Sequence, residues 1–223
     1  TKADRVTDER LQQCRAEINR LLQNTFLQDS TRFVTSIEDP GSFDALLTHL
    51  RSKADDYQRQ QQQRPFRLAI DRTFSVKGSG VVITGTAHSG CVSVDEHLHH
   101  FPSGELVRIR GIRTQDQESN QAQSGERCAL NISGLELTRL QRGDWLSATP
   151  PAGYRTLSLD LQISKDFPRS VKHWTPVHVY HATHHTQARL ALAPSQRLEP
   201  GQTGRVDLIL DKALHCHRGD RLV

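Results

Sequence analysis

Apolar residues in the first quarter of the chain recur at helical spacing. Residues 7–23 place apolar side chains three or four positions apart, which predicts an amphipathic helix capped by Thr7 or Asp8. Residues 42–57 repeat this pattern, with Ser42 as the expected N-cap. Between the two helices, residues 32–35 form a short apolar run that predicts a strand beside an incomplete sheet.

The periodicity changes from helical to two-residue after a polar run at residues 58–64. That run, QRQQQQR, ends before Pro65 and predicts a linker. Leu68 and Ile70 then alternate with polar or small residues, and residues 77–80 read Lys-Gly-Ser-Gly, which predicts a turn. Residues 66–91 are therefore expected to form a β-hairpin followed by a departing strand.

The remaining chain predicts β-structure in two groups. In the first group, alternation predicts strands over residues 106–112, 127–132 and 140–146, with a polar loop over 115–124. In the second group, strands are expected over residues 157–161 and 206–210, followed by a terminal turn and strand over 218–223. We expect two separate antiparallel barrels joined at Pro150-Pro151.

Composition narrows the class of protein only modestly. The net charge is +4, with 35% hydrophobic and 5% aromatic residues, which suits small β-barrels better than a large enzyme core. A bland basic surface and a nucleic-acid site remain equally compatible with this charge. The four cysteines form no CxxC pair, which favours a reducing compartment over a disulfide framework or a zinc site. No apolar run reaches the roughly 20 residues of a membrane helix, and no signal peptide is visible.

A histidine cluster in the last third raises the question of a metal site. On one continuous strand, His178 and His184 would face one side while His181 and His185 would face the other. Three ligands would then not converge, so we predict no metal here. Polar surface positions or contacts to an RNA backbone are the expected roles.

The segment FRLAIDRTFSVKGSGVVITGTAHSGC, residues 66–91, resembles the opening of the second domain of translational GTPases, with its pattern DxxFxxxGxGxVxxGxxxxG. The later run GERCALNISG…LQRGDWL is similar to the GxxxAxxxxG…xxRGxxL ending of the same domain. The resemblance implies an α+β chain in three parts. Residues 1–64 would be the C-terminal piece of an α/β GTPase domain with its linker. Residues 65–150 would be β-barrel domain 2, and residues 151–223 an incomplete β-barrel domain 3.

The first four residues, TKAD, resemble the guanine-reading motif Asn/Thr-Lys-x-Asp of these GTPases. The resemblance implies that Lys2 covers the base, that Asp4 accepts its donors, and that the loop at Ser36 meets its carbonyl. The alternative is that Asp4 merely caps the first helix. Neither a GxxxxGK(S/T) phosphate loop nor a DxxG switch element is present in the 223 residues. We therefore expect GTP or GDP with Mg in the intact protein. We expect no catalytic residue and no bound cofactor in this chain, weak nucleotide affinity and no turnover.

Within the superfamily, the pair Asp71-Arg72 most resembles the selenocysteine-specific elongation factors, the SelB family. That resemblance implies an aminoacyl pocket formed by Asp71, Arg72 and Arg127. Two guanidinium groups favour an anionic selenolate over a neutral hydroxyl, and Asp71 can orient one of them. The alternative is an ordinary surface ion pair. Arg113 and Gln115 lie where relatives approach the terminal adenosine of the tRNA.

These observations predict a piece of a GTP-dependent factor that delivers selenocysteinyl-tRNA to the ribosome at recoded UGA codons. The absence of methionine and the abrupt start at Thr1 also suggest a segment of a longer protein. The resemblance implies a cytoplasmic protein with no membrane partner, and an mRNA hairpin bound by C-terminal modules that this chain lacks. The alternatives are a translational GTPase that carries another aminoacyl-tRNA, and a β-barrel interaction module with no RNA role.

Overall fold

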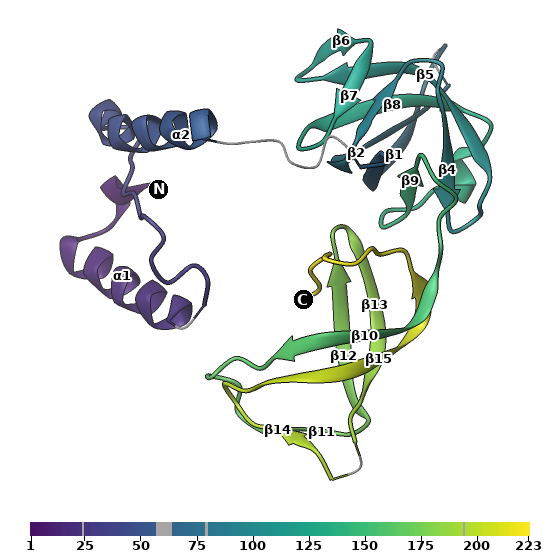
Figure 1. The fold of residues 1–223 in the computed structure, drawn as a ribbon. Coiled ribbons are helices and arrows are strands. Elements are labelled where there is room, and N and C mark those ends of the chain that lie inside the picture. Colours follow the sequence, from purple (N-terminus) through teal and green to yellow (C-terminus); the bar gives the residue numbers. More distant parts are fainter. Residues whose placement is uncertain (24, 57–63, 79, 194) are drawn as a thin grey trace. The chain divides into compact units, whose positions relative to one another are not determined.

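The computed structural model describes residues 1–23, 25–56, 64–78, 80–193 and 195–223 (Figure 1). The chain divides into two compact units, Thr1–Gln58 and Arg59–Val223. The predicted linker at 58–64 falls almost entirely outside the described residues. No helix among the described residues is long and apolar enough to cross a bilayer.

The first unit is helical. A 3-10 turn, η1 (Ala3–Arg5), precedes helix α1 (Asp8–Leu22), and η2 (Pro40–Phe43) leads into helix α2 (Asp44–Asp56). Both predicted helices are confirmed, and Thr7 caps α1 by accepting a hydrogen bond from the Arg10 N–H at 3.4 Å. The N-cap prediction for Ser42 is wrong, because Ser42 lies inside η2.

The strand predicted at residues 32–35 is also wrong. These residues have no regular secondary structure, and the described part of this unit holds only an isolated bridge between Ser36 and Asp39. An apolar run becomes a strand only when a neighbouring strand pairs with its backbone, and no described segment of the unit does so. The expected incomplete sheet is therefore absent from these described residues.

The first barrel, residues 67–147, is an antiparallel sheet closed on itself. Its strand order is β4-β9-β1-β2-β8-β5-β6, and the pairing of β4 with β5 closes the ring. The strands of this part are β1 (Arg67–Val76), β2 (Gly80–Ser89), β3 (Cys91–Ser93), β4 (His97–Phe101), β5 (Leu106–Thr114), β6 (Gln117–Ser119), β7 (Gln121–Gln123), β8 (Arg127–Ser133) and β9 (Trp145–Ser147). A 3-10 turn, η3 (Leu137–Arg139), precedes β9.

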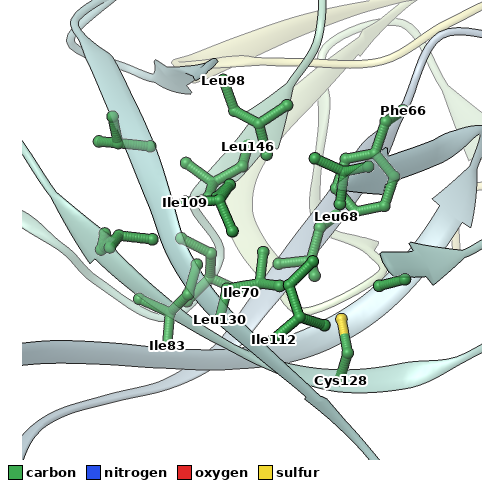
Figure 2. Close-up of a cluster of buried hydrophobic side chains, with 14 of the residues drawn as sticks. Phe66, Leu68, Ile70, Ile83, Leu98, Ile109, Ile112, Cys128, Leu130 and Leu146 are labelled. Atoms are coloured by element: carbon green, nitrogen blue, oxygen red, sulfur yellow. The ribbon is translucent and has the colours of Figure 1, made fainter. Parts of the chain in front are cut away.

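The first barrel has one apolar core (Figure 2). Alternate residues of β1, β2, β5 and β8 point inward, so that Leu68, Ile70, Ile83, Ile109 and Leu130 are fully buried. The predicted hairpin is confirmed, with Val76 opposite Gly80. Gly85 is required where it stands, because a Cβ atom there would lie 2.2 Å from the Ala69 carbonyl oxygen.

Two expectations for this barrel need correction. The segment 115–124 is not a plain loop, since β6 pairs with β5 and β7 pairs with β3. Its polar sequence hides these strands because their side chains are largely solvent-exposed. The strand expected over 140–146 begins only at Trp145, after η3 and a turn.

The second β-domain, residues 154–223, contains a four-stranded antiparallel sheet of order β10-β15-β13-β12 and a two-stranded sheet, β11-β14. Its strands are β10 (Tyr154–Gln162), β11 (Val171–Lys172), β12 (Thr175–His181), β13 (His184–Ala191), β14 (Arg197–Leu198) and β15 (Thr203–Leu214). No described strand pairing joins these sheets to the first barrel, which agrees with the expected separation near Pro150-Pro151. Residues 218–223 include the predicted turn but no assigned strand, although Val223 and Tyr180 exchange two backbone hydrogen bonds.

The predicted faces of the histidine cluster are wrong. A tight turn at Ala182 and Thr183 separates β12 from β13, so the cluster spans two paired strands rather than one. His178 and His185 consequently share an exposed face, with His178 Nδ1 2.9 Å from His185 Nε2, whereas His181 is buried. Among the described residues, no group of three or more His, Cys, Asp or Glu side chains could hold a metal. All four cysteines are free.

Candidate functional site

The candidate aminoacyl pocket is centred on an ion pair between strands β1 and β8. Arg127 Nε and Nη2 donate to Asp71 Oδ2 at 3.1 and 2.9 Å, and Nη2 also lies 3.2 Å from Oδ1. The two residues are 56 positions apart, and the pairing of β1 with β2 and of β2 with β8 brings them together. The expected contact between Asp71 and one of the two arginines is therefore present.

A local irregularity in β1 aims Asp71 at this contact. Ile70 lies opposite Gly85 and Arg72 lies opposite Thr84, so that Asp71 has no partner on β2. This is a β-bulge, which bends a strand and redirects the side chain of the extra residue. A regular strand would alternate through this position without the bend.

Thr84 completes the arrangement and was not identified from the sequence. Its hydroxyl donates a short hydrogen bond to Asp71 Oδ1, and Arg127 Nη2 lies 3.4 Å from the same hydroxyl. Arg72 lies opposite Thr84 on β1, whereas Arg127 lies opposite Thr86 on β8 and reaches Thr84 through its side chain. Its place one residue before Gly85 in the glycine-rich pattern is the only signal that could have marked it.

The pair is accessible from solvent. The Arg127 side chain is 58% exposed and that of Asp71 is 21% exposed. The neighbouring residue Cys128 points into the core, where burial, and secondarily the charge of Glu126, raise the pKa of its thiol to about 12. Cys128 therefore stays a neutral packing residue and adds no charge to the site.

A hollow of about 1210 Å³ lies on the same side of the first barrel. Thr84 and Arg127 line it together with Phe74, Arg110, Arg113 and Gln115, whereas Asp71 and Arg72 do not. Arg113 Nη2 donates to the Asp116 carbonyl oxygen at 2.7 Å, which ties Arg113 to the turn formed by Gln115 and Asp116. The two residues predicted for the terminal adenosine thus share one hollow with Arg127.

The predicted guanine-binding residues are partly brought together in the first unit. The Ser36 hydroxyl donates to Asp4 Oδ1, and the Ala3 N–H donates to the Thr35 carbonyl at 3.3 Å. Lys2 precedes η1 in a left-handed conformation and is exposed. Asp4 does not cap α1, since Thr7 does, so that alternative is wrong. The backbone N–H of Ser36 is already engaged with Ser42 Oγ at 3.0 Å.

Buried polar groups connect the first barrel to the second β-domain along a seam formed by Arg67, Trp145, His181, His215 and Asp220. Arg67, whose side chain is 5% exposed, lies 2.8 Å from Asp220 Oδ2 through Nη2 and 4.8 Å from the centre of the Trp145 ring. His181 Nε2 lies 3.1 Å from the same carboxylate oxygen. The burial of Arg67 could not be predicted from the sequence, because its alternation with Leu68 and Ile70 predicts an exposed face.

Comparisons with known proteins find similar translation elongation factors. Residues 157–223 match the model of the β-barrel domain of selenocysteine-specific elongation factors. The whole chain is 34% identical to the selenocysteine-specific elongation factor of Escherichia coli, of which it spans 34%. The chain thus covers about a third of the length of that curated relative.

Solved structures show the same fold. The apo form of the elongation factor SelB from Methanococcus maripaludis matches 99% of this chain and 51% of its own, with a TM-score of 0.79 at 19% identity. The same factor in complex with the GTP analogue GppNHp gives a TM-score of 0.75 at 20% identity and covers 99% of this chain and 52% of its own. At these identities the likeness concerns the fold alone.

Proposed function

We propose that this chain, which is similar over its whole length to the selenocysteine-specific elongation factors, forms part of a GTP-dependent factor that delivers selenocysteinyl-tRNA to the ribosome. In this proposal, the first barrel holds the aminoacyl end of the tRNA. Asp71, Arg72 and Arg127 recognise the side chain of selenocysteine. Arg113 and Gln115, in the same hollow, contact the terminal nucleotide.

The bidentate ion pair between Arg127 and Asp71 is the observation that supports the proposal most directly. Among the hydrogen bonds of the described residues, Arg127 uses Nε and Nη2 toward Asp71 and Thr84, and Nη1 takes part in none. A guanidinium oriented along one edge presents the remaining nitrogen to a ligand in a defined direction. An arginine that served only as a surface counter-ion would need no second-strand threonine to fix its carboxylate partner.

The chemistry of the ligand fits this arrangement. A selenol is more acidic than a thiol and is therefore anionic at neutral pH, whereas the hydroxyl of serine stays neutral. Arg127, with Arg72 across Thr84, supplies positive charge that favours the anion. Exclusion of water by the bound tRNA end would strengthen this preference.

We propose that Lys2, Asp4 and Ser36 contact the guanine base in the intact factor, with Mg²⁺ and the phosphates held outside this chain. The base would have to displace the hydrogen bonds that Ser36 makes with Asp4 and Ser42. The ribosome, an mRNA hairpin bound by further modules and a cytoplasmic location belong to the same proposal. A carrier of another aminoacyl-tRNA is the second candidate.

The test compares two tRNAs in a full-length GTP-bound factor that contains this chain. Arg127→Ala is expected to weaken selenocysteinyl-tRNA by about 1.5–3 kcal/mol, or ten- to hundred-fold, because it removes a charge-assisted contact. Binding of seryl-tRNA should change little. Arg108→Ala is the matched control, since the Arg108 side chain is about as exposed as that of Arg127 and forms an ion pair with Asp95 on the same barrel. An equal loss for both tRNAs would refute the selenolate pocket and leave Arg127 with a role in RNA binding or folding.

A further inference from the structure

The hairpin turn between β12 and β13, in the second β-domain, contacts the first barrel directly behind the candidate pocket. The Thr183 hydroxyl donates to the Ile70 carbonyl oxygen at 2.8 Å. Ile70 immediately precedes Asp71 and sits at the bulge in β1. One residue of the second β-domain therefore reaches the backbone that orients Asp71.

The Ile70 carbonyl belongs to the same peptide plane as the Asp71 N–H. Because that plane is rigid, whatever fixes the carbonyl also fixes the Asp71 N–H and Cα, from which the Asp71 side chain leaves the strand. The Gly143 N–H donates to this oxygen as well, at 3.0 Å, and the Ile70 N–H donates to the Asp144 carbonyl at 2.9 Å. These contacts continue the pairing of β1 with β9 beyond Ala69, and they hold the Ile70 end of the bulge, where β2 offers Asp71 no partner.

The turn that carries Thr183 is itself held at both of its ends. On one side, His181 lies 3.1 Å from Asp220, which forms the buried ion pair with Arg67. On the other side, His184 packs closely against Gly143. A Cβ atom added to Gly143 would lie 3.0 Å from the His184 Cα atom. The Thr183 hydroxyl is thus presented to Ile70 by a rigid support rather than by a free loop.

We propose that Thr183 is a positioning residue for the Asp71–Arg127 pair, so that the second β-domain sets the geometry of the aminoacyl pocket from behind. Thr183 does not touch the tRNA in this scheme. It acts through the Ile70–Asp71 peptide. The functional part of this inference rests on the proposed selenocysteine pocket, whereas the structural part does not.

The structural part is tested on this chain by NMR of the Arg127 Nε–H group. Thr183→Val removes the hydroxyl with little change of shape and should shift that resonance, because Asp71 accepts the Nε–H hydrogen bond. Thr183→Ser keeps the hydroxyl and should leave the Arg127 Nε–H resonance at its wild-type position. Thr175→Val is the matched control, since Thr175, at the start of β12, donates to the Lys172 carbonyl at 2.8 Å within the second β-domain. An unshifted Arg127 resonance in Thr183→Val, or an equal shift in Thr175→Val, would overturn the inference.

The functional part is tested in the full-length factor. Thr183→Val should reduce the preference for selenocysteinyl-tRNA over seryl-tRNA by about threefold to tenfold, the effect of one lost hydrogen bond. In an Asp71→Ala background the same change should have no further effect on the preference. A loss of thermal stability with the preference unchanged would assign Thr183 a purely structural role and refute the proposal. If Arg127→Ala also leaves the preference unchanged, the proposed pocket itself fails, while the NMR result still decides the structural coupling.

Discussion

Replacing Asp220 by Asn should strongly destabilise the unit Arg59–Val223. The Asp220 carboxylate receives hydrogen bonds from Arg67 Nη2 at 2.8 Å and from the His217 N–H at 2.9 Å, and it lies 3.1 Å from His181 Nε2. Burial alone would raise its pKa, but the hydrogen bonds from His181 and Arg67 hold the pKa of Asp220 far below its usual range. The folded structure therefore stabilises the charged form.

The expected cost follows from the burial of the partner. The Arg67 side chain is 5% exposed and its Nε has no hydrogen-bond partner among the described residues, so Asp220 supplies its neutralising charge. Removing one member of a buried ion pair leaves the other charge uncompensated and costs about 3–5 kcal/mol. Because the Asp220 side chain is 21% exposed, water can relieve part of this cost, and we expect about 3 kcal/mol. An Asn amide also turns an NH₂ group toward donors that require an acceptor.

Urea unfolding followed by tryptophan fluorescence measures this cost directly. Trp145 lies in the seam and Trp174 is 48% exposed, so a Trp174→Phe background leaves one reporter beside Arg67. Asp95→Asn is the matched control, because the Asp95–Arg108 pair is exposed and should change the free energy of unfolding by less than about 0.5 kcal/mol. The reasoning fails if Asp220→Asn costs no more than Asp95→Asn. The double change Arg67→Met with Asp220→Leu should recover part of the loss, since it removes both charges together.

Two further predictions concern pH and nucleotide. Burial in the seam, reinforced by Arg67 and His217, lowers the pKa of His215 to about 4. The unfolded state therefore binds more protons between pH 4 and 6.5, and stability should fall by about 2 kcal/mol from pH 7 to pH 5 through this residue alone. Urea midpoints at the two pH values measure this loss, and His215→Gln should reduce the fall by that amount; an unchanged fall in the variant would contradict the prediction. For nucleotide, calorimetry of this chain should detect weak or no GDP binding, because the 223 residues contain no phosphate loop. Tight GDP binding would refute that interpretation.

The local pattern of the sequence was sufficient for many elements. Residues 66–91 predicted a hairpin because β-branched residues, alternation and glycines all favour the same structure, and Gly85 stands where only a hydrogen atom fits. The helices at 8–22 and 44–56 follow from apolar spacing and, for α1, from the Thr7 cap. The candidate pair Asp71 and Arg127 came from resemblance to a family, since 56 residues separate them.

Elements that depend on a distant partner could not be read from the sequence. Residues 32–35 have the composition of a strand but no described neighbour to pair with, whereas the polar residues 117–119 and 121–123 form strands because β5 and β3 pair with them. The histidine faces were misassigned because a two-residue turn at 182–183 reverses the chain. A strand is a property of two segments, and the spacing within one segment cannot reveal the other.

The environment of single residues was likewise decided by tertiary structure. The sequence places Arg67 on the exposed face of an alternating strand, yet the second β-domain covers that face and supplies Asp220 as its counter-ion. Thr84 and Thr183 look like ordinary strand and turn residues, and their hydroxyls acquire a role only through the bulge at Asp71. Alternation reports which side of a strand can face an apolar core, because that depends on neighbours along the chain. What covers the opposite side depends on which domain packs there, and only the folded arrangement decides it.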